Sequence, residues 1–161
     1  MARIQFTGTG KAYFVTTLSS TTSPTAVQII AGTDLTPFLR QDGLNRSQDS
    51  GLVDTATAAN LFETTDIGTR SAKLELTLYR DSETADDDAW AALEIGNRGF
   101  LVVLPFGGGG ALGVPVAADR CEVWPVAIAN RSNSAIAKDA AQVFTVSCAV
   151  TSAPVDDAVV A

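Results

Sequence analysis

The residue types that carry most enzyme chemistry are scarce in this sequence. Its 161 residues include no histidine, which removes the usual general base near neutral pH, the Ser/His and Cys/His nucleophile pairs and the imidazole ligands of most zinc and iron sites. An enzyme built from this chain would have to work with carboxylates alone, as glycosidases do, and no pair of acids stands out. We therefore expect no catalytic residues, no metal ligands, no cofactor and no enzymatic activity.

Two short motifs have the composition of a ligand site but lack its context. The acidic triplet at residues 86–88 (DDD) lacks the alternating ligands and the glycine of a calcium-binding loop, and it suits the first turn of a helix. The glycines of residues 107–113 (GGGGALG) match G-x-G-x-x-G, but Val114-Pro115 follows where a phosphate-binding helix would begin. We interpret the first motif as helix charge and the second as the tip of a hairpin.

The charge balance argues against a protein that grips nucleic acid. The chain has 18 acidic and 11 basic residues, a net charge of -7, whereas stable binding to DNA or RNA normally needs a surplus of lysine and arginine to neutralise phosphates. A negative surface is compatible with DNA that passes by without binding.

The elements that would position any site are mostly strands. Residues 71–79 (SAKLELTLY) alternate strictly between leucines on one face and polar side chains on the other, which predicts a half-buried strand. Residues 33–39 (TDLTPFL) predict an edge strand or a turn, because Pro37 has no backbone donor. Further strands are predicted at residues 11–18, 26–30, 100–106, 119–129 and 142–151.

One helix is predicted at about residues 84–96. Thr84 can cap it, the acidic triplet falls in its first turn, and Gly96 or Gly99 can end it. Trp90 and Leu93 lie three residues apart, so one stripe of this helix can pack on a sheet.

The two cysteines lie in the two strands of the predicted C-terminal hairpin. If that hairpin is symmetric about Ser134 and Ala135, Cys121 falls opposite Cys148 on the same face. No signal peptide is evident at residues 1–14, so we read both cysteines as buried thiols that act as small hydrophobes, with a disulfide as the alternative.

Residues 41–70 predict a long loop with little periodicity. Loops much beyond ~12–15 residues are uncommon inside a compact domain unless they are functional or ordered by a partner. Leu52, Val53, Leu61 and Phe62 would be unusual in a merely solvated loop. One interpretation is a disordered or short-helix excursion. We favour an arm whose four apolar side chains form a subunit interface.

The pattern as a whole predicts a mainly β fold in a single domain over residues 1–161. We expect an antiparallel β-sandwich or partly closed barrel with one α-helix and the long loop, followed by a short tail at residues 153–161. The apolar run at residues 100–106 (FLVVLPF) is far shorter than the ~20 residues that cross a bilayer, so no membrane span is expected.

Three stretches resemble the major tail tube proteins of long-tailed, siphovirus-type bacteriophages. The first is TDLTPFL at residues 33–39, which resembles the family's segment before its long loop. The second is SAKLELTLY followed by Arg80-Asp81 and DDDAW, which resembles its central strand and helix. The third is CEVWPVAIAN with QVFTVSCAVTSAPV, which is similar to its paired closing strands.

The resemblance implies a structural protein of the virion tail, assembled in the host bacterial cytoplasm. Six copies would form a ring, and stacked rings would form a hollow tube around a tape-measure protein, through which DNA later passes without binding. The tail terminator and distal tail proteins would be further partners. The family uses its long loop for contacts between subunits, which carries over to residues 41–70. Residues 1–10 and 153–161 are weaker candidates for contacts between rings.

An acidic channel would repel the phosphates of passing DNA. Glu75 and Glu122 fall on predicted strands and are our candidates for lumen-facing acids, although Lys73 and Arg120 can equally pair with them on an outer surface.

Two other functions remain open from the sequence. A tail terminator or head–tail connector would form one ring and stop. A monomeric β-sandwich binding module would use Trp90 and Trp124 as stacking platforms, although Trp90 lies on an apolar helix stripe and aromatic residues make up only 7% of the chain.

Overall fold

The computed structural model describes residues 8–59, 61–83, 86–135 and 138–161. They form an eight-stranded antiparallel sheet with the order β2-β1-β5-β6-β7-β4-β3, to which β8 adds by pairing with β6. In chain order the elements are β1 (Lys11–Val15), α1 (Ala26–Ile30), β2 (Thr33–Asp34), β3 (Leu39–Asp54), β4 (Thr65–Tyr79), α2 (Asp88–Ala92), β5 (Arg98–Leu104), a 3₁₀ turn at Ala111–Gly113, β6 (Arg120–Asn133), β7 (Val143–Val150) and β8 (Val155–Val159).

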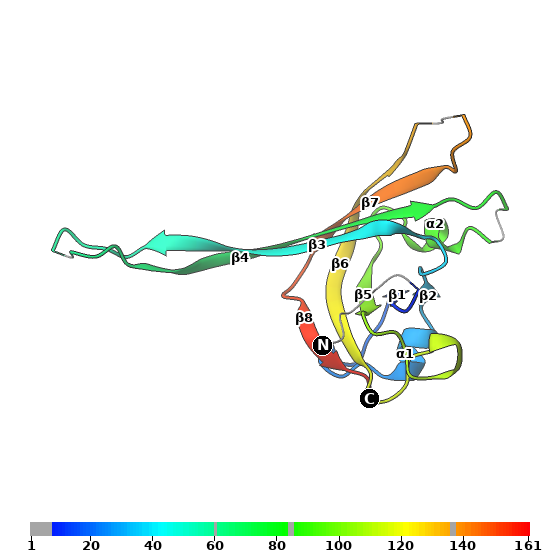
Figure 1. Ribbon diagram of the computed structural model, residues 1–161, viewed down its shortest axis with the longest axis horizontal. Coiled ribbons are helices and arrows are strands. Elements are labelled where there is room, and N and C mark those ends of the chain that lie inside the picture. The colour runs from blue at the N-terminus through cyan, green and yellow to red at the C-terminus, as the bar shows by residue number, and fades with distance from the viewer. Residues whose placement is uncertain (1–7, 60, 84–85, 136–137) are drawn as a thin grey trace.

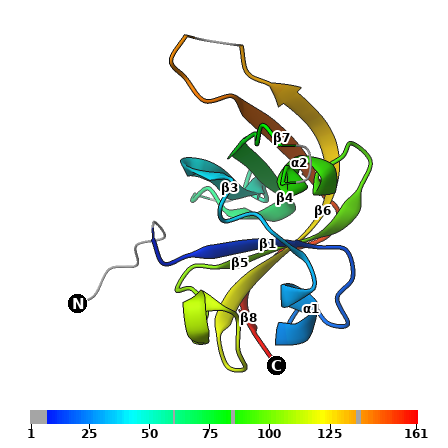
Figure 2. The same cartoon turned by 90° about the vertical axis from the view of Figure 1, so that its right-hand side faces the viewer.

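The long strand β6 belongs to two layers. Its first half pairs with β5 on one side and β8 on the other, and its second half pairs with β7. The sheet therefore folds over into a lower layer, β2-β1-β5-β6-β8, and an upper layer, β6-β7-β4-β3 (Figures 1 and 2). The sheet does not close into a barrel, so the predicted mainly β, antiparallel fold is confirmed in its open, sandwich form.

The lower layer is buried on both faces. One face packs Phe14, Leu101 and Trp124 against the upper layer and α2, and the other packs Tyr13 and Val102 with α1 and the C-terminal residues. A strand covered on both faces needs apolar residues at consecutive positions, which explains the unbroken apolar run at the end of β5. In the upper layer, by contrast, β4 shows the predicted alternation, with its leucines buried and Lys73 and Glu75 exposed.

The strand predicted at residues 26–30 is wrong, because these residues form helix α1. The Thr25 hydroxyl accepts a hydrogen bond from the backbone N–H of Gln28 at 3.3 Å, which satisfies one of the free donors at the helix start. Thr25 followed three residues later by Gln28 is the sequence pattern of a helix start. We overlooked it because the β-branched residues of this segment also favour a strand. Ile29 anchors the helix and is fully buried.

The predicted second helix exists but is much shorter than residues 84–96. Helix α2 spans Asp88–Ala92, and Thr84 lies outside the described residues. Two side chains end the helix by hydrogen-bonding to its last carbonyl groups. The Asn97 amide donates to the Ala92 carbonyl at 3.0 Å, and Arg131 donates to the Trp90 carbonyl at 2.6 Å. Leu93 has already left the helical conformation.

The C-terminal hairpin forms with another register than predicted. Cys148 lies opposite Ile128 in β6 and Leu74 in β4, whereas Cys121 lies opposite Ala158 in β8. Both cysteines are free thiols. A loop that is not symmetric about residues 134–135 and a bulge between Ile128 and Asn130 shift the pairing, and the predicted facing of the two cysteines is therefore wrong.

Residues 41–70 are not an irregular loop, and residues 153–161 are not a loose tail. The first segment belongs almost entirely to β3 and β4, which pair with each other along a long hairpin (Figure 1). The second contains β8, whose Ala158 is buried in the same cluster as Tyr13 and Val102, as is Val160 just after the strand. The outer part of the β3–β4 hairpin was not evident because a strand exposed on both faces has no alternation of apolar residues to reveal it. Strand β8 was not evident because only one of its five residues is fully buried.

Candidate assembly interface

The outer part of the β3–β4 hairpin, residues 45–71, leaves the body of the protein, and we call it the arm (Figure 1). The redirection starts at a bulge between Leu39 and Leu44. At Gly43, a Cβ atom would lie only 2.2 Å from the Thr77 carbonyl oxygen, so this bend requires glycine. From Asn45 onward, every residue of β3 is exposed.

The four predicted interface residues all lie on the outer half of the arm, and all are exposed. The exposed fractions are 72% for Leu52, 51% for Val53, 107% for Leu61 and 81% for Phe62. A fifth exposed apolar residue, Ile67, was not among the predicted ones and pairs across the hairpin with Leu52. Full burial of a large apolar side chain is worth about 1.5–3 kcal/mol, so a partner that covers this group gains stability.

Polar groups join the two sides of the arm where its tip begins, at Thr55 and Thr64. The Thr55 N–H donates to the Thr64 carbonyl at 2.9 Å, and the Thr55 hydroxyl lies 3.0 Å from the same oxygen. The charged residues of positions 52–67 are Asp54, Glu63 and Asp66, and all three are acidic. The tip therefore combines exposed apolar side chains with negative charge.

Strand β3 also leaves one backbone edge open. Among the described residues it pairs only with β4, so its 16 residues form the edge of the upper layer. At the opposite end of this layer, β6 beyond Ile128 pairs with β7 and, within the described part of the chain, with no strand on its other side. Long open edges are templates for pairing with another chain.

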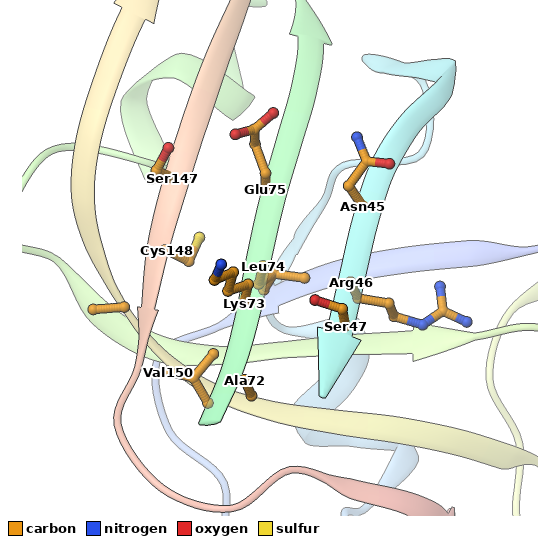
Figure 3. A pocket seen from close by; sticks show the side chains of 11 residues that line it. Asn45, Arg46, Ser47, Ala72, Lys73, Leu74, Glu75, Ser147, Cys148 and Val150 are labelled. Atoms are coloured by element: carbon orange, nitrogen blue, oxygen red, sulfur yellow. The ribbon is translucent and has the colours of Figure 1, made fainter. Parts of the chain in front are cut away.

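Glu75 lies on the outer face of the upper layer. Figure 3 shows it between Ser147 of β7 and Asn45 of β3, as the register requires. These residues and Lys73 line a shallow hollow of about 550 Å³. No ion pair to Glu75 is found among the residues that the structure describes.

Glu122 has a different environment, and the structure does not bring it together with Glu75. The Arg46 Nε atom lies 2.7 Å from Glu122 Oε2, and Arg46 Nη2 donates to Oε1 at 2.9 Å. The Trp124 indole N–H donates to Oε2 at 3.3 Å. Only 15% of the Glu122 side chain is exposed. The partner of Glu122 is thus Arg46 of the arm and not Arg120, the neighbour considered from the sequence.

The two tryptophans are held inside the fold. Trp124 is buried, and the Arg80 and Arg131 guanidinium carbons lie 3.8 Å and 3.5 Å from the centre of the Trp90 ring. Phe144 meets the same ring edge-on at 5.0 Å. These contacts do not favour Trp90 or Trp124 as a stacking platform for a ligand.

The acidic triplet has a structural role at its second position. The Asp87 carboxylate is buried, lies 2.7 Å from Arg80 Nε and accepts from the backbone N–H of Asp81. Within the described ranges, no group of three or more potential ligand side chains can hold a metal ion. None of the described helices has the length and apolarity that a membrane crossing needs.

Comparison with known proteins assigns the family. The model of the phage tail tube protein family matches residues 1–161. The chain belongs to this family. No curated protein matches the sequence. Among solved structures, the tail tube protein is similar in fold to a chain from the "Virion of native gene transfer agent (GTA) particle", with 14% identity, a TM-score of 0.54, and coverage of 82% of this chain and 91% of that one.

The family match gives the protein a structural role in a virion tail, as predicted from the resemblance. It also implies assembly with other tail proteins. Of the weaker candidate contacts at the termini, residues 1–7 lie outside the described residues, and residues 155–159 are strand β8.

Proposed function

We propose that this tail tube protein assembles into rings, six copies in each, and that the rings stack into a hollow tube through which DNA passes. The observation that carries the proposal is the arm, because it joins a 16-residue open strand edge to a group of exposed apolar side chains. A chain that stays single would have to protect both features from aggregation.

The ring contact is proposed to join two open edges. The β3 edge of one copy would pair with the free edge of β6, residues 129–133, in the next copy. Such a contact joins different surfaces of identical subunits. If the rotation from each subunit to the next adds up to a full turn, the subunits close into a ring. The continuous sheet that results leaves no upper-layer edge exposed.

The arm is proposed to contact neighbouring copies through Leu52, Val53, Leu61 and Phe62, joined by Ile67. Contacts of this kind between rings leave an unpaired copy of the contact surface at each end of the stack. Further rings can therefore add there, and a filament grows.

The outer face of the upper layer is proposed to line the channel. Its exposed side chains are mainly short hydroxyls and amides with Lys73 and Glu75 between them. This geometry favours Glu75 over Glu122 as the lumen-facing acid, since Glu122 is occupied by Arg46. A face without a basic surplus gives passing DNA no site to bind.

The proposal makes the protein a non-enzymatic component. The tape-measure protein would lie inside the tube during assembly, and the tail terminator and distal tail proteins would contact its two ends. Each of these partners is inferred from the family.

Electron microscopy of the purified chain over a series of concentrations tests the proposal. Stacked rings or tubes that lengthen with concentration would support it. Single rings at every concentration would indicate a terminator or connector, and isolated particles of one chain would indicate a monomeric binding module.

A further inference from the structure

The base of the arm is held by polar contacts where its apolar packing ends. Leu44 is the last residue of β3 that packs on the core, and β3 is exposed from Asn45 onward. Hollows of about 440 Å³ and 580 Å³ lie beneath the arm base, the first lined by Arg46 and Glu122 and the second by Gln48 and Asp156. Apolar packing alone therefore does not fix the direction of the arm.

Two side chains of β3 cross this space to the lower layer. Arg46 forms the bidentate ion pair with Glu122 of β6, at 2.7 Å and 2.9 Å. Two residues further, the Gln48 amide nitrogen donates to both carboxylate oxygens of Asp156 in β8, at 2.8 Å and 3.0 Å. We call these four residues the arm clamp.

We propose that the arm clamp is a positioning device that fixes the direction of the arm in the free subunit, before any partner is bound. The two contacts join β3 to different strands, so together they oppose rotation of the arm about its base. The bidentate geometry adds orientation, because both guanidinium nitrogens must stay aligned with the carboxylate plane. The Trp124 indole N–H holds the same carboxylate from the body side.

The consequence for assembly rests on the proposed function. An arm that already points in the bound direction loses less conformational freedom when it docks on a neighbouring copy. A freely swinging arm would have to be ordered at each addition, and its apolar tip would meet wrong surfaces.

The test measures the direction of the arm in the unassembled full-length chain. Spin labels are placed at Ala58→Cys on the arm and Val27→Cys on α1, with Cys121→Ala and Cys148→Ala to remove the native thiols. The distance between the labels is recorded by double electron–electron resonance. We expect one narrow distance with the clamp intact and loss of that narrow distance in Arg46→Glu/Gln48→Ala.

A charge exchange and a matched control make the test specific. Arg46→Glu/Glu122→Arg restores an attractive pair, so we expect recovery of the narrow distance relative to Arg46→Glu alone. Glu63→Lys changes the charge of the arm far from the clamp and should leave the narrow distance in place. A narrow distance that persists in Arg46→Glu/Gln48→Ala would overturn the proposal, and so would equal broadening in Glu63→Lys or no recovery in the exchange variant.

The same samples separate the two proposals. If the unlabelled native chain forms no rings or tubes but the label distance behaves as expected, the proposed function fails and the clamp stands. If tubes form normally and the distance does not depend on the clamp, only the clamp fails.

Discussion

At the scale of single residues, the fold depends on arginines that hold specific carbonyl, carboxylate and aromatic groups. Arg131 donates to the Trp90 and Leu93 carbonyls at the end of α2, and its guanidinium lies over the Trp90 ring. Arg80 lies over the same ring and binds the buried Asp87 carboxylate. This cluster attaches the short helix α2 to β4 and β6, which explains why a five-residue helix is stable.

Replacing Trp90 with leucine should therefore destabilise the chain. Trp90→Leu keeps an apolar side chain but removes both cation–π contacts, and we expect the free energy of unfolding to fall by about 2 kcal/mol. Urea unfolding of the unassembled chain measures this change. Arg98→Ala, an exposed arginine at the start of β5, is the control and should change the free energy by less than about 0.5 kcal/mol. Equal effects in the two variants would contradict the role of the cluster.

The two thiols give a second prediction at this scale. Burial raises the pKa of Cys121 to about 11, with smaller contributions from Asp119 and Glu122, and burial raises the pKa of Cys148 to about 12, both from an ordinary value of 9.0. Above that ordinary value the unfolded chain loses these protons while the folded chain keeps them. Their contribution to stability is complete below pH 9 and is lost as the pH rises toward 11 and 12.

Urea unfolding at about pH 8 and about pH 10 checks this direction. The native chain should lose about 1 kcal/mol per thiol more than Cys121→Ala/Cys148→Ala between the two conditions. Tyr13, whose pKa is also raised by burial and by Asp34, is present in both proteins and cancels in the comparison. A native chain with no steeper pH dependence than the variant would show that the thiols are not protected by the fold.

At the scale of elements, the arm and α1 show what the sequence can and cannot predict. Strand β4 was predictable near Leu74, Leu76 and Leu78, because one of its faces is buried and the alternation records that burial. The same strand further out is exposed on both faces, so nothing in its pattern separates it from a loop. Helix α1 was misread because four of its five residues are β-branched or small and fit a short strand as well as a helix, and only its cap distinguishes the two.

The four candidate interface residues are conspicuous in the sequence because their type differs from that of their neighbours. Leu52, Val53, Leu61 and Phe62 are large apolar residues in a polar stretch, and the structure exposes all four. The partner of Glu122 could not be predicted, since Arg46 lies 76 positions away in the sequence. Only the tertiary fold brings a pair so distant in sequence together.

Shortening the arm should separate folding from assembly. Residues 52–67 are replaced with Asn-Gly, which joins Gly51 to Gly68 through a two-residue hairpin turn. The core residues remain, so we expect cooperative urea unfolding, as in the native chain, and no tubes in electron microscopy. Tubes of normal length from this variant would refute the role of the arm.

A finer pair of variants tests the apolar tip itself. Leu61→Ser/Phe62→Ser removes apolar area worth about 1.5–3 kcal/mol per side chain, which should raise the concentration needed for assembly by about tenfold or more. Ala58→Ser/Ala59→Ser changes the same tip with little loss of apolar area and serves as the matched control. Light scattering during assembly gives the concentration that each of the two variants needs to assemble.

At the scale of the whole molecule, the two layers have different roles. Both contribute side chains to the core between them, whereas the upper layer also carries the open edge, the arm and the polar outer face. A net charge of -7 gives the protein no basic surplus with which to hold DNA phosphates. The proposed channel face contributes to this through Glu75.

Reversing that charge should make the tube retain DNA. In Glu75→Lys every copy in a ring gains a cation next to Lys73, so assembled tubes should bind DNA at low salt and release it as salt is raised. Co-sedimentation of tubes with labelled DNA measures the binding. Glu94→Lys, an exposed acid outside the upper layer, is the control, and equal DNA retention by both variants would place the channel elsewhere.

The most direct test of the central claim is electron cryomicroscopy of the native chain at a resolution that traces strands. We predict a hollow tube of stacked rings in which the outer edge of β3 is hydrogen-bonded to a neighbouring copy and Leu61 and Phe62 are buried between subunits. Particles of a single chain at every concentration, or a tube in which the β3 edge and the arm tip face solvent, would contradict the account.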